Sequence, residues 1–156
     1  MMNNIIIQEV NKLSSMSDES IEQAVEAERV LKSLPQVFIT TDHILHAGVY
    51  IRTVMIPKDV VITGALMKRS TNLIISGHVL VFIGNDKVRE YKGYNIITAS
   101  SNRKQVFIAK EDTYLTMFFA TKVDNIEDAE EEFTNEIDIL MSRHPIGINN
   151  ITITGE

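Results

Sequence analysis

The sequence predicts a mainly β protein, built as a small barrel or double-sheet jelly roll with one helix on each side of it along the chain. Residues 36–121 contain about ten short segments rich in Val, Ile, Phe, Tyr and Thr, separated by Gly, Pro, Asn, Asp and Lys. So many short strands in one small region are typical of a jelly roll. Strands and helices do not alternate, which disfavours a Rossmann fold or a TIM barrel.

The length of 156 residues predicts a single domain with appendages. We expect an N-terminal helical segment at 1–35, the β-barrel at 36–121, and an acidic helix with a tail strand at 122–156.

The N-terminal helix has clear boundaries. Ser17 can cap it, Asp18 and Glu19 would lie in its first turn, and Pro35 would end it. Residues 3–10 could form a short strand or a frayed helix. Apolar residues recur at helical spacing, which predicts an amphipathic helix packed on the domain or on a partner subunit; they are Ile21, Ala24, Val25, Ala27, Val30, Leu31 and Leu34.

Strands are expected near 36–40, 43–46, 49–56, 59–66, 72–76, 78–83, 87–91, 94–98, 105–109 and 113–120. Pro57-Lys58-Asp59 predicts a turn, and Gly84-Asn85-Asp86-Lys87 predicts a hairpin turn. Residues 124–143 predict an acidic helix that stops at His144-Pro145. The β-branched tail at 146–156 predicts a last strand, paired within the chain or across a subunit edge.

Charge is distributed unevenly along the chain. The net charge is −6, yet residues 36–121 carry 10 basic and 6 acidic side chains, a balance of +4. Overall acidity argues against binding to duplex nucleic acid, but it leaves room for a compact anion pocket in the core. No apolar run approaches the ~20 residues that span a bilayer, so no membrane partner is expected. The N-terminus has no basic segment of a secretory signal, and the absence of Cys favours a reducing cytoplasm.

Motifs for known chemistry are absent, and the histidines are poorly spaced for a metal. The sequence has no Walker loop, dinucleotide glycine fingerprint, HExxH or GxSxG. His43 and His46 are three residues apart, which places them on opposite faces of a strand. A structural role for them is therefore favoured over metal ligation.

Residues from about 34 to 133 resemble cupin-like proteins encoded by tailed bacteriophages. The resemblance is carried by LPQV at 34–37, HILHAGVYIR at 43–52, IP at 56–57, ITG at 62–64, LIISG at 73–77 and KED at 110–112. It implies a small cupin barrel acting in the host cytoplasm, or in the virion. It implies a fold more directly than a function.

The same resemblance argues against a metal site. In metal-binding relatives, histidines lie after the ITG segment and on the last barrel strand. The matching positions here are Met67, Thr71 and Phe118, and none of these can replace an imidazole. No metal and no other cofactor are therefore expected.

Cations and an aromatic side chain lie around the positions of the absent histidines. If they face the interior, they suit a phosphate or carboxylate ligand, because Arg binds such anions with two parallel hydrogen bonds. The alternative is that they lie on outer faces or in turns. The predicted ligand-binding residues are Tyr50, Arg52, Lys68, Arg69, Asn72, Arg103, Lys104 and Gln105.

Three functions follow from these observations. The first is a non-enzymatic phage protein that binds a small anionic ligand and sequesters, as one use, a nucleotide-type immune signal of the host. The second is a virion or assembly protein acting through protein contacts, and a homo-oligomer is expected in either case. The third is a metal-independent cupin enzyme of isomerase or lyase type, with His43, Tyr50 and either Asp42 or Asp112 as its acid–base candidates. No catalytic residue is assigned.

Overall fold

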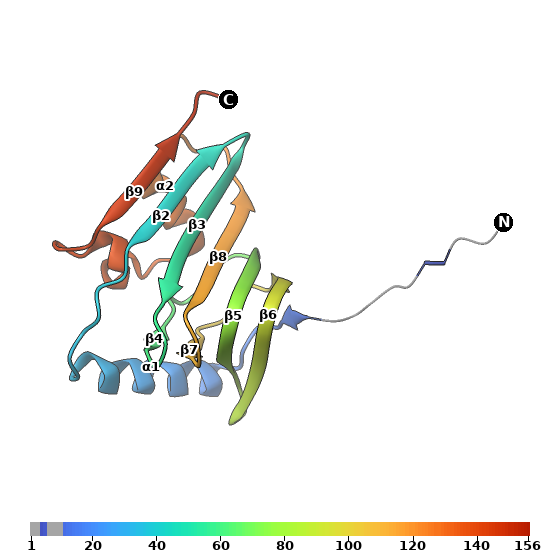
Figure 1. The fold of residues 1–156 in the computed structure, drawn as a ribbon, viewed down its shortest axis with the longest axis vertical. Helices are drawn as coiled ribbons and strands as arrows, with labels where there is room; N and C mark the ends of the chain where they lie inside the picture. Colours follow the sequence, from blue (N-terminus) through green and yellow to red (C-terminus); the bar gives the residue numbers. More distant parts are fainter. Residues whose placement is uncertain (1–3, 6–10) are drawn as a thin grey trace.

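The computed structural model describes residues 4–5 and 11–156, and its strands form two layers flanked by helices (Figure 1). The expected strand or helix at residues 3–10 lies almost entirely outside the described residues. The strands are β1 (Lys12–Leu13), β2 (Thr41–His46), β3 (Val49–Ile56), β4 (Val61–Thr63), β5 (Thr71–Gly84), β6 (Lys87–Ala99), β7 (Val106–Ala109), β8 (Thr113–Ala120) and β9 (Asn149–Ile153).

The nine strands form one hydrogen-bonded sheet that bends into two layers, called two sheets below, which share the long hairpin of β5 and β6. The larger sheet runs in the order β6-β5-β8-β3-β2-β9, while β7 pairs with the far half of β5 and β4 pairs with β7. β1 adds a short parallel pairing to β6. This strand order confirms the predicted mainly β, jelly-roll class with flanking helices.

Gly77 is the point at which β5 passes from one sheet to the other. Residues 72–76 pair with β8, and residues 79–82 pair with β7. Gly77 has φ +147°, and a Cβ placed there would lie 2.5 Å from the Thr113 hydroxyl oxygen. Only glycine fits this close approach, and the bend that follows separates the two sheets and leaves an interior between them.

The predicted turns form, but the strands are fewer and longer than expected. Asn85 and Asp86 both have positive φ in the β5–β6 hairpin, as its sequence predicts. The strands predicted at 72–76 and 78–83 are one continuous strand, β5, and those predicted at 87–91 and 94–98 are one continuous strand, β6. The reason is that the pairing between β5 and β6 continues past Gly77 and Gly93. Residues 36–40 are not a strand, since β2 begins at Thr41.

Helix α1 (Asp18–Lys32) begins where the sequence predicts, with the Ser17 hydroxyl accepting a hydrogen bond from the Ser20 amide at 3.2 Å. Its buried face is narrower than the apolar pattern predicts. Val25 and Val30 are exposed, and the buried positions include Ala24 and Glu28. The helix contacts the sheet mainly along β4 and β5.

Helix α2 (Ile126–Phe133) is shorter than the predicted 124–143. Thr134 is extended and pairs with Met67 in an isolated bridge, which draws the chain out of the helix. Two 3₁₀ turns follow, η1 (Ile137–Ile139) and η2 (Met141–Arg143). The predicted tail strand is confirmed as β9, which pairs in parallel with β2 within the chain.

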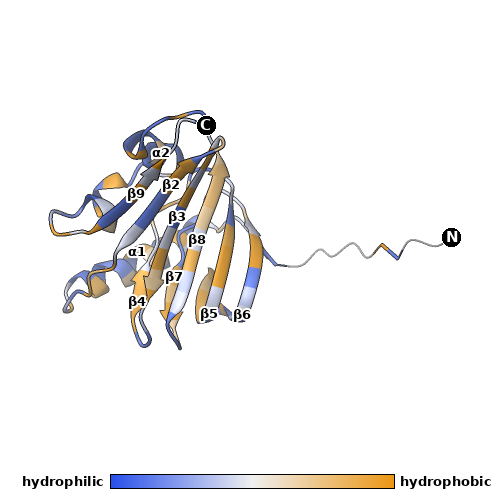
Figure 2. Ribbon diagram, turned by 45° about the horizontal axis from the view of Figure 1, so that its top comes forward, coloured by the Kyte–Doolittle hydropathy of each residue, from blue (hydrophilic) through white to orange (hydrophobic). Residues whose placement is uncertain are grey.

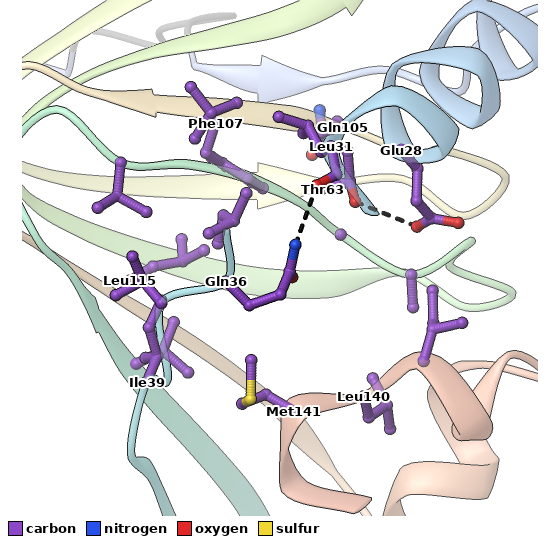
Figure 3. A pocket seen from close by; sticks show the side chains of 18 of the residues that line it. Glu28, Leu31, Gln36, Ile39, Thr63, Gln105, Phe107, Leu115, Leu140 and Met141 are labelled. Carbon is purple, nitrogen blue, oxygen red and sulfur yellow. Dashed lines mark hydrogen bonds between the residues drawn. The ribbon is translucent and has the colours of Figure 1, made fainter. Parts of the chain in front are cut away.

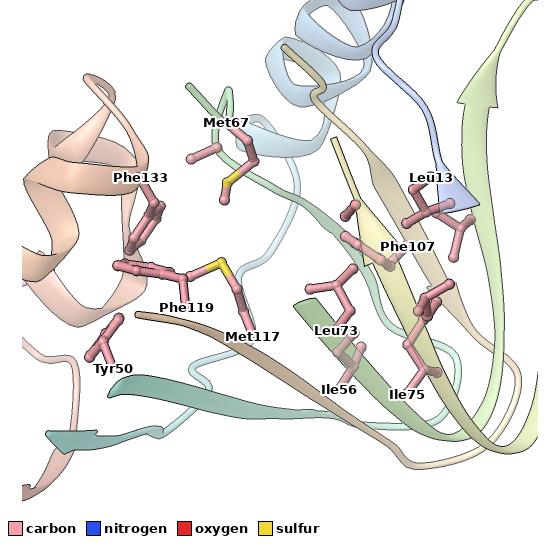
Figure 4. Close-up of a cluster of buried hydrophobic side chains, with 14 of the residues drawn as sticks. Leu13, Tyr50, Ile56, Met67, Leu73, Ile75, Phe107, Met117, Phe119 and Phe133 are labelled. Carbon is pink, nitrogen blue, oxygen red and sulfur yellow. The ribbon is translucent and has the colours of Figure 1, made fainter. Parts of the chain in front are cut away.

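The core lies between the sheets. Figure 2 shows hydrophobic residues along β8 and much of β5. Tyr50, Phe119 and Phe133 meet at the end nearest α2, while Leu73 and Ile75 pack at the other end (Figure 4). Within the described residues, no helix is long and apolar enough to cross a membrane.

Candidate ligand-binding cavity

A cavity of about 510 Å³ lies between the two sheets (Figure 3). Its walls come from β3, β4, β5, β7 and β8, and its rim comes from α1, residues 34–39 and the segment around η2. The size falls within the range of pockets that hold small molecules.

The cavity wall is mostly apolar. Inward-facing positions of the strands supply it, because alternate residues of a strand point to the same face. Among them are Leu73, Phe107, Leu115 and Met117, which are joined at the rim by Leu140 and Met141.

Arg103 is the cation most deeply placed in this wall. The residue is only 2% exposed, and its Nη2 donates to the Thr71 hydroxyl at 2.7 Å. Its buried Nε–H has no hydrogen-bond partner, and no carboxylate pairs with it among the described residues. Burial lowers the pKa of Arg103 to about 10. The protein therefore encloses a positive charge beside an apolar cavity without supplying a counter-charge.

The two residues that follow Arg103 point in different directions. Gln105 is buried and lines the same cavity. Lys104 is fully buried on another side, where its Nζ lies 3.0 Å from Glu28 Oε2 and 3.0 Å from Glu136 Oε1. Lys104 is thus a structural cation, already paired, and outside the cavity wall.

Arg52 lines the cavity but is held by other groups. Its Nη1 lies 2.8 Å from Glu130 Oε2, and its Nη2 donates to the Ser142 hydroxyl at 3.1 Å. Burial raises the pKa of Glu130, but hydrogen bonds from Ser142 and Arg143 and the nearby Arg52 charge outweigh it, so that the pKa lies below its ordinary value. Arg52 is therefore neutralised within the protein.

Tyr50 and His43 lie behind this ion pair and do not line the cavity. The Tyr50 hydroxyl is 2.7 Å from His43 Nδ1, and His43 Nε2 is 2.8 Å from the Asn149 side-chain oxygen of β9. Burial lowers the pKa of His43 and raises that of Tyr50. Asp42, on the opposite face of β2, bonds Asn150 instead.

The other three predicted site residues lie outside the cavity. Lys68 bonds the Asn135 side chain at 2.8 Å. Arg69 pairs with Glu132 at 2.9 Å and lies over the Phe119 ring, and Asn72 is exposed. The cavity thus collects Arg52, Arg103 and Gln105 from the predicted set, and ligand binding by the set stays a prediction.

Sequence reasoning missed the rim of the cavity. Residues 36–40 were expected to form a strand, Leu34 was expected to belong to the first helix, and that helix was expected only to pack. In the structure, Leu31 and Gln36 face the cavity, where the Gln36 amide donates to the Leu31 carbonyl at 2.9 Å (Figure 3). Pro35 is the signal in the sequence that could have indicated this segment. A proline stops a helix, and the apolar residues on either side of it then lie at the opening of the cavity.

Of the positions that the resemblance matched to metal ligands, only some lie at the cavity. Met67 lines the cavity, and Thr71 accepts the Arg103 bond. Phe118 does not line the cavity, whereas its neighbour Met117 does. No group of three His, Cys, Asp or Glu that could hold a metal occurs in the part of the chain that the structure describes.

Comparison with known proteins gives structural likeness alone. No family model matches the sequence, and no curated protein does. Solved structures that are similar include a cupin-2 domain protein from Shewanella frigidimarina, with 10% identity, coverage of 64% of this chain and 98% of that chain, and a TM-score of 0.43. A protein from Neisseria meningitidis has 10% identity, coverage of 65% and 96%, and a TM-score of 0.47.

A third similar structure is an RmlC-like cupin family protein with a double-stranded β-helix fold from Methanocaldococcus jannaschii, with 17% identity, coverage of 55% and 87%, and a TM-score of 0.41. The cupin descriptions belong to those proteins. The jelly-roll class of this chain rests on its own strand order, and no activity is transferred from them.

Proposed function

We propose that this chain is a non-enzymatic binding protein whose barrel interior holds a small organic anion. The observation that carries the proposal is Arg103, buried in the wall of the cavity with an unpartnered Nε–H and no carboxylate beside it among the described residues. A buried charge is costly unless it is paired and hydrogen-bonded. An anion in the cavity would supply the missing counter-charge.

The narrower form of this proposal is a phage protein of the host cytoplasm that sequesters a nucleotide-type immune signal. The basic balance of residues 36–121 supports an anionic ligand in general. A phage origin and a nucleotide ligand are additional steps, which the experiment below addresses by identifying what the protein retains.

Native mass spectrometry of the full chain, purified from infected or signal-producing cells, tests the proposal. We expect an added mass that is lost on denaturation and that binds again when returned. Arg103→Met should abolish the retained mass, while Arg29→Met, which removes an exposed arginine paired with Glu26, should keep it. A chain that retains nothing and binds no anion would contradict the proposal.

A second candidate is an assembly protein that acts through protein contacts. The observation that favours it is the exposure of β9, a sheet-edge strand whose Ile151 and Ile153 are 53% and 49% exposed. Such an edge can pair with another chain. Light scattering during size-exclusion chromatography checks this, and a monomer at high concentration would argue against it.

The third candidate, a metal-independent enzyme, required His43 beside a carboxylate inside the cavity. His43 contacts Tyr50 and Asn149 instead, behind the cavity wall. The geometry thus favours the binding proposal over acid–base catalysis by these residues.

A further inference from the structure

Arg103 is a cation on the cavity wall that has no carboxylate partner among the described residues. Lys32 lies 3.6 Å from Glu28, and Arg52 lies 2.8 Å from Glu130, so both of these wall cations have carboxylate partners. Arg103 has none among the described residues. The carboxylates of Glu28 and Asp59 also lie on the wall and would repel an anion of higher charge.

Most of the remaining wall is apolar, and its polar members include Glu28, Gln36 and Thr63. Leu73, Phe107 and Met117 offer no hydrogen bonds that a sugar or a polar ring could use. The rim continues this character, since Leu34 and Val37 line it and are 51% and 46% exposed. An apolar tail that extends from the interior would cover both.

Arg103 and Gln105 provide a polar end for the ligand. They are two residues apart in an extended segment, which directs both side chains to the cavity. A guanidinium such as that of Arg103 can donate to a carboxylate, and the Gln105 amide can supply a further donor.

We infer, resting on the function proposed above, that the occupant is an organic acid with one negative charge and an apolar body, whose carboxylate binds Arg103. The cavity of about 510 Å³ corresponds to roughly 15 to 20 non-hydrogen atoms at the ~30 Å³ that a water molecule occupies. An unbranched acid of about thirteen to eighteen carbons, with its two oxygens, is of this size, and the shorter decanoate fits within it. A nucleotide, with its polar base and sugar, matches this wall poorly.

Isothermal titration calorimetry on the full chain tests the ligand class with five probes. They are decanoate, the neutral 1-decanol, the short acid butyrate, adenosine monophosphate with its two charges, and cyclic adenosine monophosphate with one. We expect decanoate to bind at least tenfold more tightly than each of the others.

Variants then test the role of Arg103. Arg103→Met should lower decanoate affinity tenfold or more, to the level of 1-decanol, while 1-decanol binding is retained. Arg29→Met, an exposed arginine on the same helix as Leu31 but outside the cavity lining, should leave both affinities unchanged. Cooperative urea unfolding checks that each variant is folded. If Arg103→Met does not fold, the five-probe comparison on the unaltered chain still tests the ligand class.

The possible failures are distinguishable. Equal affinity for decanoate and 1-decanol, or tighter binding of either nucleotide, would overturn the ligand class and leave an anion-binding function in place. Unchanged decanoate affinity in a folded Arg103→Met would overturn the role of Arg103. Failure of every anion to bind, with no retained ligand, would overturn the proposed function as well.

Discussion

Lys104 shows how a single residue joins three parts of the chain. Its side chain is fully buried, and it pairs with Glu28 of α1 and with Glu136, which follows α2. Glu136 also accepts a hydrogen bond from the Leu66 amide. A buried cation between two carboxylates is a stable arrangement only while all members are present.

Replacing Lys104 by Met should therefore destabilise the protein strongly. Removing one partner of a fully buried ion pair typically costs about 3–5 kcal/mol of unfolding free energy, and the loss here should be smaller, because Glu28 and Glu136 are partly exposed and Glu28 keeps Lys32. Urea unfolding measures the loss. The matched control is Lys68→Met, an exposed lysine that bonds only Asn135 and should change stability by no more than about 0.5 kcal/mol. Similar values for the two variants would show that Lys104 contributes only as a surface cation.

Residue types alone could not separate Arg103 from its neighbour. Both were predicted as ligand-binding residues from the same short run, with no signal in the sequence for their different environments. The difference comes from elements distant in sequence, since α1 and the segment after α2 bring carboxylates to Lys104 but not to Arg103.

At the scale of elements, the tail strand β9 is held by a buried histidine. Asn149 bonds His43 through its side-chain oxygen and the Ser142 carbonyl through its side-chain nitrogen. Burial lowers the pKa of His43, and the Arg52 charge adds to this, while Asn149, Glu130 and Asp42 oppose it. The folded state thus favours the neutral ring, whose Nδ1 accepts from Tyr50 while its Nε2 donates to Asn149.

Stability should therefore fall as the pH drops below the ordinary histidine pKa of about 6.5. The unfolded chain binds a proton there before the folded chain does, so that protonation favours unfolding, by on the order of 1 kcal/mol for each unit by which the pKa is lowered. Urea unfolding at pH 7.5 and pH 5.5 measures this. Glu130, whose pKa is also lowered, adds a loss only at more acid pH, as the pH falls below the ordinary glutamate value.

His43→Gln should remove most of the change between pH 7.5 and pH 5.5. His46→Gln is the matched control, because His46 is an exposed residue of the same strand, and that variant should keep the pH dependence. If the control lost it and His43→Gln kept it, the buried ring would not be its source.

Element boundaries were predictable where local chemistry sets them. The Ser17 cap and the hairpin turn at Asn85-Asp86 form as expected, because side-chain capping and positive φ are local properties. The end of α2 was not predictable, since the bridge of Thr134 to Met67 depends on a segment distant in sequence.

At the scale of the whole molecule, the outer face of the larger sheet carries an apolar patch. Strand pairing places Tyr94 and Tyr114 on either side of Ser76, and Ile96 beside Ile74. Tyr94, Ile96 and Tyr114 are 66%, 60% and 56% exposed. Contiguous apolar patches of this kind commonly mark protein interfaces, which supports the proposal of a homo-oligomer.

Light scattering should accordingly find more than one subunit, and Ile96→Lys should shift the mass toward a monomer, because a charge in a packed apolar contact must be desolvated. Val88→Lys is the control. Val88 is also exposed and on β6, but it pairs with Phe82 in the half of β6 away from this patch. An assembly that dissociates equally with both variants would place the interface elsewhere.

The sequence by itself determined the mainly β class, the capped first helix, the turns and the tail strand, because each depends on local spacing or on a few neighbouring residues. Only the tertiary structure decided which predicted cations face the cavity and which are paired, and where the cavity opens. The physical reason is that burial and pairing are set by contacts between distant segments. Gly77 bends β5, and α1 brings Glu28 to Lys104, while Arg103 is left on the wall without a carboxylate partner among the described residues.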